Sequence, residues 1–265
     1  MIKIGVAGCA GKMGKMIVDA VLKEKNVVLS GCFEKKDSTE IGKNVISASG
    51  IKTDLIIQDD IKKIINDIDI IIDFTTPEAT LNNIKVVNEY KKKIVIGTTG
   101  LNEAQLNEIK NYSKNIAIVL SPNMSTGVNL LFKLVEEVSK IIGYDADIEI
   151  VEYHHNLKKD APSGTALKLA DNIAKTLDWQ LNEVIKTGRD GIIGKRPKKE
   201  IGVFAIRAGD IVGEHTVIFA MEGERIELTH KAHSRMTFAV GAVKAAIWLN
   251  NKLSGFYNMN DVLGI

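Results

Sequence analysis

The chain has 265 residues, of which 45% are hydrophobic and 26% are charged, a composition typical of a folded globular protein with one large or two ordinary domains. Its 35 basic and 33 acidic residues leave a formal net charge of +2, so no overall field favours nucleic acid or an anionic membrane as a partner. We therefore expect neither partner, and we expect any anionic ligand to be a small molecule that is bound locally.

The start of the chain and its cysteine usage indicate a cytoplasmic protein. From Met1 the sequence passes directly into an apolar strand pattern, without the basic region, hydrophobic core and cleavage site of a secretory signal. No apolar run approaches the length needed to span a membrane. Cys9 and Cys32 supply neither a disulfide framework nor a Cys-x-x-Cys motif, and we expect both to be buried packing residues.

Up to about residue 142 the sequence alternates short β-branched runs with amphipathic helical patterns. The run Ile70-Ile71-Ile72 is apolar at every position, which indicates a strand that is buried on both faces. Strands that alternate with helices predict right-handed crossovers and a parallel, doubly wound sheet. In chain order we expect strands at 2–7, 27–33, 68–74, 94–96 and 116–120, and helices at 12–25, 77–91 and 127–142.

The pattern then changes to one that favours an open, mixed sheet. Hairpin-like turns and one long insertion connect its predicted strands, and the insertion, residues 186–199, is rich in Gly, Lys and Arg and is predicted to be a loop. The last helix is apolar almost all round, so we expect it to pack back on the first domain. The elements are strands at 147–153, 203–207, 216–220 and 225–229, a helix at 166–177 and a last helix at 236–250.

A glycine-rich loop, Gly8-Cys9-Ala10-Gly11-Lys12-Met13-Gly14, connects the first strand to the first helix. Glycines there allow a tight turn and the close approach of a pyrophosphate, which would rest on the N–H groups at the helix start, although the loop departs from the commonest fingerprint at Cys9. Glu34 follows about 20 residues beyond the loop, where an acidic side chain can bind the adenosine ribose, and Lys35 beside it can accept a 2′-phosphate. The cofactor is therefore expected to be NADPH, NADH or both.

Two further predicted strands end in small polar loops. These are Gly97-Thr98-Thr99-Gly100 and Ser121-Pro122-Asn123-Met124-Ser125. Because ligands of open parallel sheets bind outside the carboxyl ends of the strands, we expect the nicotinamide ribose and carboxamide to lie against these loops.

Chemistry-bearing residues are densest in the run from Glu152 to Ala166, EYHHNLKKDAPSGTA. It combines proton-transfer groups and a cation with a helix start, where Ser163 is predicted as the N-cap and Gly164 and Thr165 offer N–H groups and a hydroxyl to an anion. The adjacent histidines lack the helical spacing typical of metal ligands, so no metal is expected. The run predicts an active site.

This run, with the loop at 8–14, the loop at 97–100 and the segments 207–215 and 234–238, resembles the dihydrodipicolinate reductase family over nearly the whole chain. The resemblance implies an oxidoreductase of the diaminopimelate and lysine pathway that reduces a cyclic imine dicarboxylate with NADPH or NADH. It also implies a Rossmann-like domain and a second domain that forms a homotetramer.

Carried over residue by residue, the resemblance gives a role to each position. The proton donor falls on His154 and the second catalytic cation on Lys158. Substrate-binding positions fall on His155, Ser163, Gly164 and Thr165. Cofactor-binding positions fall on Gly8, Cys9, Ala10, Gly11, Lys12, Met13, Glu34, Lys35, Gly97, Thr98, Thr99, Ser121, Pro122, Asn123 and Met124.

Two of the cofactor positions depart from the family pattern. Lys35 stands where an arginine is common, and Ser121-Pro122-Asn123-Met124 stands where Ala-Ala-Asn-Phe or a relative of it is frequent. The preference between NADPH and NADH therefore stays open.

Together these features predict an α/β fold with a Rossmann-like parallel-sheet dinucleotide-binding domain, residues 1–125 and 236–265. A second α+β domain with an open mixed sheet, residues 126–235, would bind substrate and form the oligomer. The alternation of Val217, Phe219 and Met221 gives that sheet an apolar face, which we assign to a contact between subunits, with packing on the helix at 166–177 as the alternative.

Two other functions are weighed against this one. Another two-domain dehydrogenase of aspartate-derived metabolites, such as aspartate-semialdehyde dehydrogenase, would need a cysteine nucleophile, but Cys9 and Cys32 lie far in sequence from the histidines. A non-catalytic nucleotide-sensing protein would have no reason to keep His154 and Lys158 beside an anion-binding turn.

Overall fold

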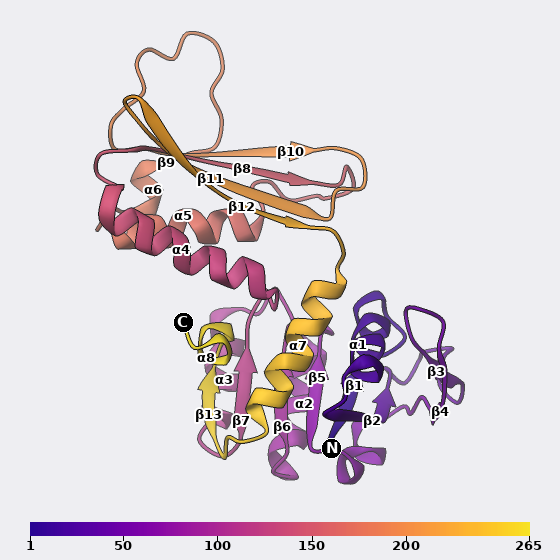
Figure 1. Cartoon of the computed structure of the whole chain (residues 1–265). Coiled ribbons are helices and arrows are strands. Elements are labelled where there is room, and N and C mark those ends of the chain that lie inside the picture. Colours follow the sequence, from indigo (N-terminus) through magenta and orange to yellow (C-terminus); the bar gives the residue numbers. More distant parts are fainter. The chain divides into compact units, whose positions relative to one another are not determined.

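The computed structural model describes residues 1–265, and its strands form two main sheets in two separate units (Figure 1). Unit 1 comprises Met1–Thr126 and Arg235–Ile265, and unit 2 comprises Gly127–Ser234. None of the helices combines the length and the apolar character needed to cross a membrane.

Unit 1 is built on a parallel six-stranded sheet, which confirms the predicted Rossmann-like arrangement. From β1 the chain adds β2 on one side and then continues with β5 on the other side. The order therefore reverses between β1 and β5, the kind of place where open α/β sheets bind ligands. In the order β13-β7-β6-β5-β1-β2, the strands are β13 (Gly255–Tyr257), β7 (Ala117–Leu120), β6 (Lys93–Ile96), β5 (Ile70–Asp73), β1 (Ile2–Ala7) and β2 (Val27–Phe33).

Helices cover both faces of this sheet and enclose two apolar clusters (Figure 1). Ile70 and Ile72 belong to one cluster and Ile71 to the other, so the apolar run in β5 is buried on both faces as predicted. The first cluster is covered by α1 (Lys12–Lys23), α7 (Met236–Leu249) and α8 (Met259–Leu263), and the second by α2 (Pro77–Glu89), α3 (Glu103–Tyr112) and the 3₁₀ turns Ile61–Lys63 and Ile65–Asp67.

The elements that the sequence analysis missed are short or largely polar. They are the hairpin of β3 (Asn44–Ile46) and β4 (Lys52–Ile56), the edge strand β13, the two 3₁₀ turns, the helices α3 and α8 and, in unit 2, helix α6 (Leu181–Val184) and strand β9 (Ile185–Lys186). Helix α3 carries a capping box, in which Asn102 accepts from the N–H of Gln105 and the side chain of Gln105 accepts from the N–H of Asn102. That pair is a sequence-level signal of a helix start that could have identified α3.

Asp19 fastens α1 to the chain that follows β3. Its buried carboxylate accepts hydrogen bonds from Oγ of Ser47 at 2.9 Å, from Nζ of Lys23 at 2.7 Å and from Oγ of Ser49. Burial opposes ionisation, but these donors outweigh it and lower the pKa of Asp19 to about 2. The carboxylate therefore remains charged in the folded protein at neutral pH.

Unit 2 contains the predicted open, mixed sheet. Strands β8, β10 and β9 are parallel, whereas β11 is antiparallel to both β8 and β12. In the order β12-β11-β8-β10-β9, the strands are β12 (Glu224–Ala232), β11 (Gly213–Met221), β8 (Asp147–His154), β10 (Ile201–Arg207) and β9 (Ile185–Lys186). The helices of this unit are α4 (Thr126–Ile142), α5 (Gly164–Thr176) and α6 (Leu181–Val184).

The apolar face of β11 packs against helices of its own unit, so assigning that face to a subunit contact was wrong. Val217 and Phe219 are fully buried in a cluster with residues of α4 and α5 such as Val135 and Leu169. Alternation in a strand predicts that one face is buried, but it does not say which layer covers that face. Here amphipathic helices supply the layer.

We expect Asp19→Asn to destabilise the protein by about 2 kcal/mol at pH 7, because the carboxylate has a lower pKa folded than unfolded. The folded protein has the lower pKa, so the ionised carboxylate stabilises it fully at pH values above the unfolded pKa of 3.8. This stabilisation is lost as the pH falls toward the folded pKa of about 2. Urea unfolding from pH 7 to pH 2.5 measures the difference in free energy of unfolding between the parent and the variant. This difference should become smaller below about pH 4. The exposed Asp54→Asn is the control, and a gap that does not depend on pH would contradict the assignment.

Candidate active site

The glycine-rich loop of unit 1 can be formed only by glycine at two of its positions. Gly8 adopts a φ of +63°, in the left-handed region that favours glycine. At Gly14, a Cβ would lie 2.0 Å from the carbonyl oxygen of Gly8, so helix α1 could not pack this closely on the loop with any other residue. No side chain caps α1 at its N-cap, Gly11. The first N–H groups of the helix thus have the geometry of an anion site.

Glu34 and Lys35 lie beside this loop as predicted, and each has a partner within the protein. Oε1 of Glu34 accepts a hydrogen bond of 2.9 Å from the N–H of Ala10, so the carboxylate braces the loop. Nζ of Lys35 lies 3.1 Å from the carboxylate of Asp37, and both side chains are about three-quarters exposed. A phosphate that binds Lys35 would therefore compete with a solvated ion pair, which is a weak competitor.

A pocket of about 280 Å³ lies where β5, β6 and β7 end, and the remaining predicted cofactor residues except Ser121 line it. The Thr98 hydroxyl in its wall is hydrogen-bonded to the hydroxyl of Thr80 at 2.7 Å, and the Ser121 hydroxyl donates to the carbonyl of Asn123 at 2.8 Å. Sequence reasoning missed Phe74, Thr75 and Phe238, although Phe238 lies in a segment that carried the resemblance. The lining residues are Met13, Phe74, Thr75, Gly97, Thr98, Thr99, Pro122, Asn123, Met124 and Phe238.

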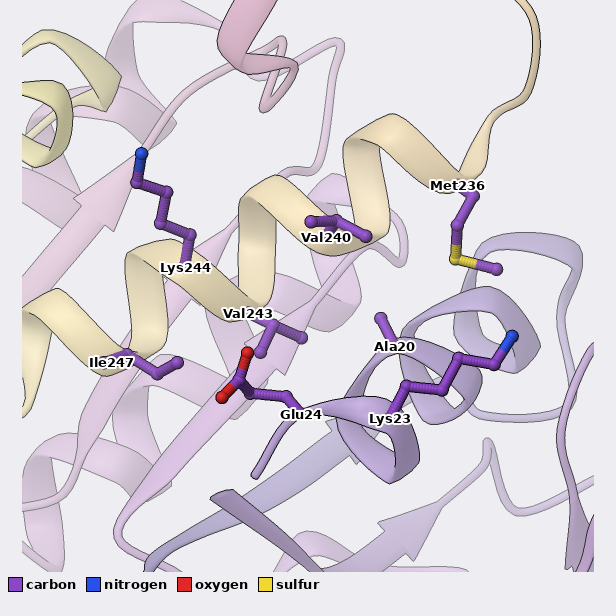
Figure 2. A pocket seen from close by; sticks show the side chains of 8 residues that line it. All are labelled: Ala20, Lys23, Glu24, Met236, Val240, Val243, Lys244 and Ile247. Atoms are coloured by element: carbon purple, nitrogen blue, oxygen red, sulfur yellow. The ribbon is translucent and has the colours of Figure 1, made fainter. Parts of the chain in front are cut away.

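A second hollow of unit 1, of about 350 Å³, lies between α1 and α7 (Figure 2). Val240, Val243 and Ala20 lie between the two helices, and the ammonium groups of Lys23 and Lys244 point away from one another. Its lining contains no histidine, cysteine or hydroxyl group. It also contains no residue of the glycine-rich loop or of the strand ends, where open α/β sheets bind ligands, so the candidate site of unit 1 is the pocket at the strand ends.

In unit 2, strand β8 ends at His154, and the side chain of this residue is fixed by Glu152. Nδ1 of His154 lies 2.5 Å from Oε2 of Glu152. Because an ionised carboxylate only accepts hydrogen bonds, the proton of the neutral ring is on Nδ1, and Nε2 is the nitrogen that can take up a second proton and donate it to a ligand. Burial lowers the pKa of His154, against the hydrogen bond to Glu152, which raises it. Once protonated, the His154 ring is therefore a stronger acid than a free imidazolium.

The carboxylate of Glu152 is fully buried and holds three groups at once. Both of its oxygens accept from the guanidinium of Arg207, at 2.8 and 2.9 Å, and Oε1 also accepts from the N–H of Ser163 at 2.9 Å. Burial opposes ionisation, but the bonds from Arg207, His154 and Ser163 hold the pKa of Glu152 below its usual value. Glu152 is therefore an anion that links the end of β8 to the start of α5.

Ser163 is the N-cap of α5, as predicted. Its hydroxyl accepts from the N–H of Ala166 at 3.2 Å and lies 3.2 Å from Nε2 of His215. Burial lowers the pKa of His215 to about 3, so this imidazole is neutral. Its ring meets that of His154 edge-on, with 5.3 Å between the centroids. The polar atoms of Ser163 are thus engaged by protein groups, whereas exposed Gly164 presents the helix start to solvent.

Lys158 follows in the loop after β8 and is held by Asp160. Its ammonium nitrogen lies 2.9 Å from both carboxylate oxygens of Asp160, and this contact lowers the pKa of Asp160. The carbonyl of Asp160 in turn accepts from Arg207 at 2.7 Å. The ammonium of Lys158 is therefore near the Glu152–His154 pair, and it can exchange an exposed carboxylate for that of a ligand.

The remaining predicted residues of this unit lie around the same point. His155 is the first residue beyond β8 and is partly buried, and Thr165 lies in the first turn of α5. Gly213 leaves room for the ring of His154, because a Cβ there would lie 3.0 Å from Nε2 of that residue. Arg207, Gly213 and His215 had no role assigned, although segment 207–215 carried the resemblance and could have suggested them.

A glycine-rich loop on a doubly wound parallel sheet, together with a second unit that places an imidazole near a helix start, is typical of NAD(P)H-dependent oxidoreductases. The family model for the N-terminus of dihydrodipicolinate reductase matches residues 2–124, and the model for its C-terminus matches residues 127–263. The chain therefore belongs to the dihydrodipicolinate reductase family, which confirms the resemblance.

Individual relatives agree with this assignment. The chain is 49% identical over all of its 265 residues, and over 99% of the relative, to a protein of Syntrophus aciditrophicus (strain SB) named 4-hydroxy-tetrahydrodipicolinate reductase. A dipicolinate-bound dihydrodipicolinate reductase from Paenisporosarcina sp. TG-14 shares the fold, with a TM-score of 0.74, 23% identity and coverage of 97% of each chain.

The cysteines argue against the aspartate-semialdehyde dehydrogenase alternative. Cys9 and Cys32 are both buried, and the hydrogen bond of the Cys32 thiol to Cys9 together with burial raises the pKa of that thiol. Neither is placed as a thiolate nucleophile. An aspartate semialdehyde dehydrogenase II from Vibrio cholerae is similar in fold, with a TM-score of 0.54, 11% identity and coverage of 94% of this chain and 98% of that one. This likeness reflects a shared scaffold rather than shared chemistry.

Proposed function

We propose that this protein catalyses the reaction for which its Syntrophus relative is named, the reduction of 4-hydroxy-tetrahydrodipicolinate to tetrahydrodipicolinate in diaminopimelate and lysine biosynthesis, with NADPH or NADH. The observation that carries the proposal is the junction at Glu152. One buried carboxylate holds both a proton-donating imidazole, His154, and Ser163, the cap of an anion-binding helix. A cyclic imine dicarboxylate needs both functions at adjacent points.

In the proposed reaction, His154 is the general acid and Lys158 the substrate-holding cation. When bound, the nicotinamide supplies the hydride. The 4-hydroxyl of the substrate leaves as water, which gives the conjugated ring. Hydride arrival at a ring carbon then drives electron density toward the ring nitrogen, and Nε2 of His154 delivers the proton that this nitrogen takes up. Lys158 leaves Asp160 for a substrate carboxylate, and Gly164 and Thr165 bind a carboxylate at the start of α5, with His155 beside them. The negative charge of the substrate raises the proton affinity of His154 when it is needed.

The cofactor would be held by the residues of unit 1. The N–H groups at the start of α1, from Gly11 to Met13, would bind the pyrophosphate, and Glu34 and Lys35 would bind the adenosine ribose or its phosphate. The pocket of Thr98, Asn123 and Met124 would take the nicotinamide end. Unit 1 is then the dinucleotide-binding domain and unit 2 the substrate domain.

We also propose a cytoplasmic homotetramer assembled through unit 2. On the sheet face opposite α4 and α5, Val151, Ile206 and Ile218 leave apolar groups partly or largely exposed. An apolar sheet face of this kind is normally buried by another layer. A second copy of the same sheet would supply that layer.

His154→Ala should lower kcat by about two to four orders of magnitude, the contribution of a general acid. Steady-state oxidation of the nicotinamide cofactor at 340 nm with the substrate measures it, and cofactor affinity should be unchanged. His233→Ala, at an exposed histidine, is the control. A folded His154→Ala variant within threefold of the parent would refute the role.

Lys35→Glu should lower the affinity for NADPH by about tenfold or more and leave the affinity for NADH nearly unchanged. The reason is that the substitution replaces attraction between this side chain and a 2′-phosphate by repulsion. Calorimetric titration of both cofactors measures the two affinities. Lys36→Glu makes the same charge change one residue along and serves as the control. Equal weakening of NADH and NADPH by Lys35→Glu would show that Lys35 does not recognise the phosphate.

Ile218→Glu should reduce the oligomer to smaller species, because it buries a charge in the proposed sheet contact. Light scattering on a sizing column gives the mass, which should be that of a tetramer for the parent. Leu106→Glu, at a similarly apolar site on α3, should leave the mass unchanged. A parent protein of monomer mass would overturn the oligomer proposal.

A further inference from the structure

We propose that Glu152 and Arg207 act as a positioning pair that holds His154 in one tautomer and ties it to the start of α5. This inference rests on the proposed function, because it concerns the proposed proton donor. Neither residue would touch the substrate, so each acts through His154 and through the cap of α5.

The geometry assigns all four hydrogen bonds of the buried carboxylate. His154 and one nitrogen of Arg207 share Oε2, while Ser163 and the other nitrogen of Arg207 share Oε1. A fully buried carboxylate is stable only when such partners compensate its charge, and a bidentate guanidinium is the strongest of them. Loss of either member of the pair would therefore leave the other uncompensated.

Arg207 does more than compensate the buried charge of Glu152. Without Arg207, the Glu152 carboxylate would make His154 a poor acid. Glu152 alone would stabilise the imidazolium and retain the proton. Arg207 divides the charge of the carboxylate between two cations, which weakens its hold on His154. Arg207 also donates to the carbonyl of Asp160, so the same residue orients the loop that carries Lys158.

The charged and titratable groups around His154 come from every element packed against it. Glu152 lies on its own strand, Arg207 on β10 and His215 on β11, while Lys158 and Asp160 lie in the loop after β8. His215 is neutral, and Lys158 is paired with Asp160. Beside burial, Glu152 is thus the charged group that acts most strongly on the protonation of His154, and Lys158 and Arg207 oppose it.

Two substitutions of the pair should move the titration of His154 in opposite directions. Glu152→Gln removes the group that stabilises the imidazolium and should lower the pKa of His154 by about one unit. Arg207→Gln leaves the carboxylate to His154 alone and should raise it by a similar amount. Nuclear magnetic resonance of the ring, without ligands, measures both shifts, and a merely structural role would not give opposite signs.

The control is Glu149→Gln. Glu149 lies on the same strand and is also bound by arginines, Arg189 and Arg196, but it faces the other side of the sheet. Its substitution should leave the His154 titration unchanged. If the pair variants fail to fold, the nitrogen shifts of His154 in the parent protein are decisive. A proton on Nδ1 supports the pairing, and a proton on Nε2 overturns it.

The same variants separate this inference from the proposed function. The pH profile of kcat/KM should fall as the acid loses its proton, at lower pH in Glu152→Gln and at higher pH in Arg207→Gln. If the pKa of His154 shifts in opposite directions in the two variants but the pH profile of kcat/KM does not follow, the pair is supported and the proton-donor role is contradicted. Ring shifts that are absent or of the same sign would overturn the pair.

Discussion

The arrangement of unit 2 depends on one buried anion. The carboxylate of Glu152 cannot leave water without compensation, and its four hydrogen bonds join His154 of its own strand to two other segments of the chain, at Arg207 and at Ser163. It therefore determines where β8 ends, where α5 begins and how β10 approaches them. The side chains that can act on a ligand, at His154 and at the start of α5, owe their relative placement to this single group.

Most of the fold could be predicted from local patterns, because those patterns express burial directly. Ile70-Ile71-Ile72 gave a strand covered on both faces, and the amphipathic stretch ending at Ile142 gave α4. The hairpin at 44–56 escaped because its strands are short and largely exposed. Phe219 shows a second limit of sequence-based prediction. The alternation of apolar residues around it correctly predicted that it is buried, but which layer covers that face is a non-local property.

The residues of the candidate site also divide into those that local sequence patterns predict and those that depend on non-local contacts. His154, Lys158 and Ser163 lie within ten residues of one another, so their coincidence was visible in one dimension. Arg207 and His215 lie about fifty residues further on, and only the parallel pairing of β10 and the antiparallel pairing of β11 with β8 bring them to Glu152. The spacing of residues in the sequence does not predict such a contact, because the order of the strands is set by the packing of the whole sheet.

The bond between Glu34 and the N–H of Ala10 means that the glycine-rich loop is braced before any ligand arrives. A loop that is already ordered loses little conformational freedom on binding, so its contacts are realised nearly in full as affinity. The brace also separates two properties that flexible loops combine. The shape of the loop is fixed from within, while the charged side chains of Lys35 and Asp37, which follow Glu34, are exposed. Cofactor preference in such a protein can change over evolution by surface substitutions alone, without any redesign of the fold that carries it.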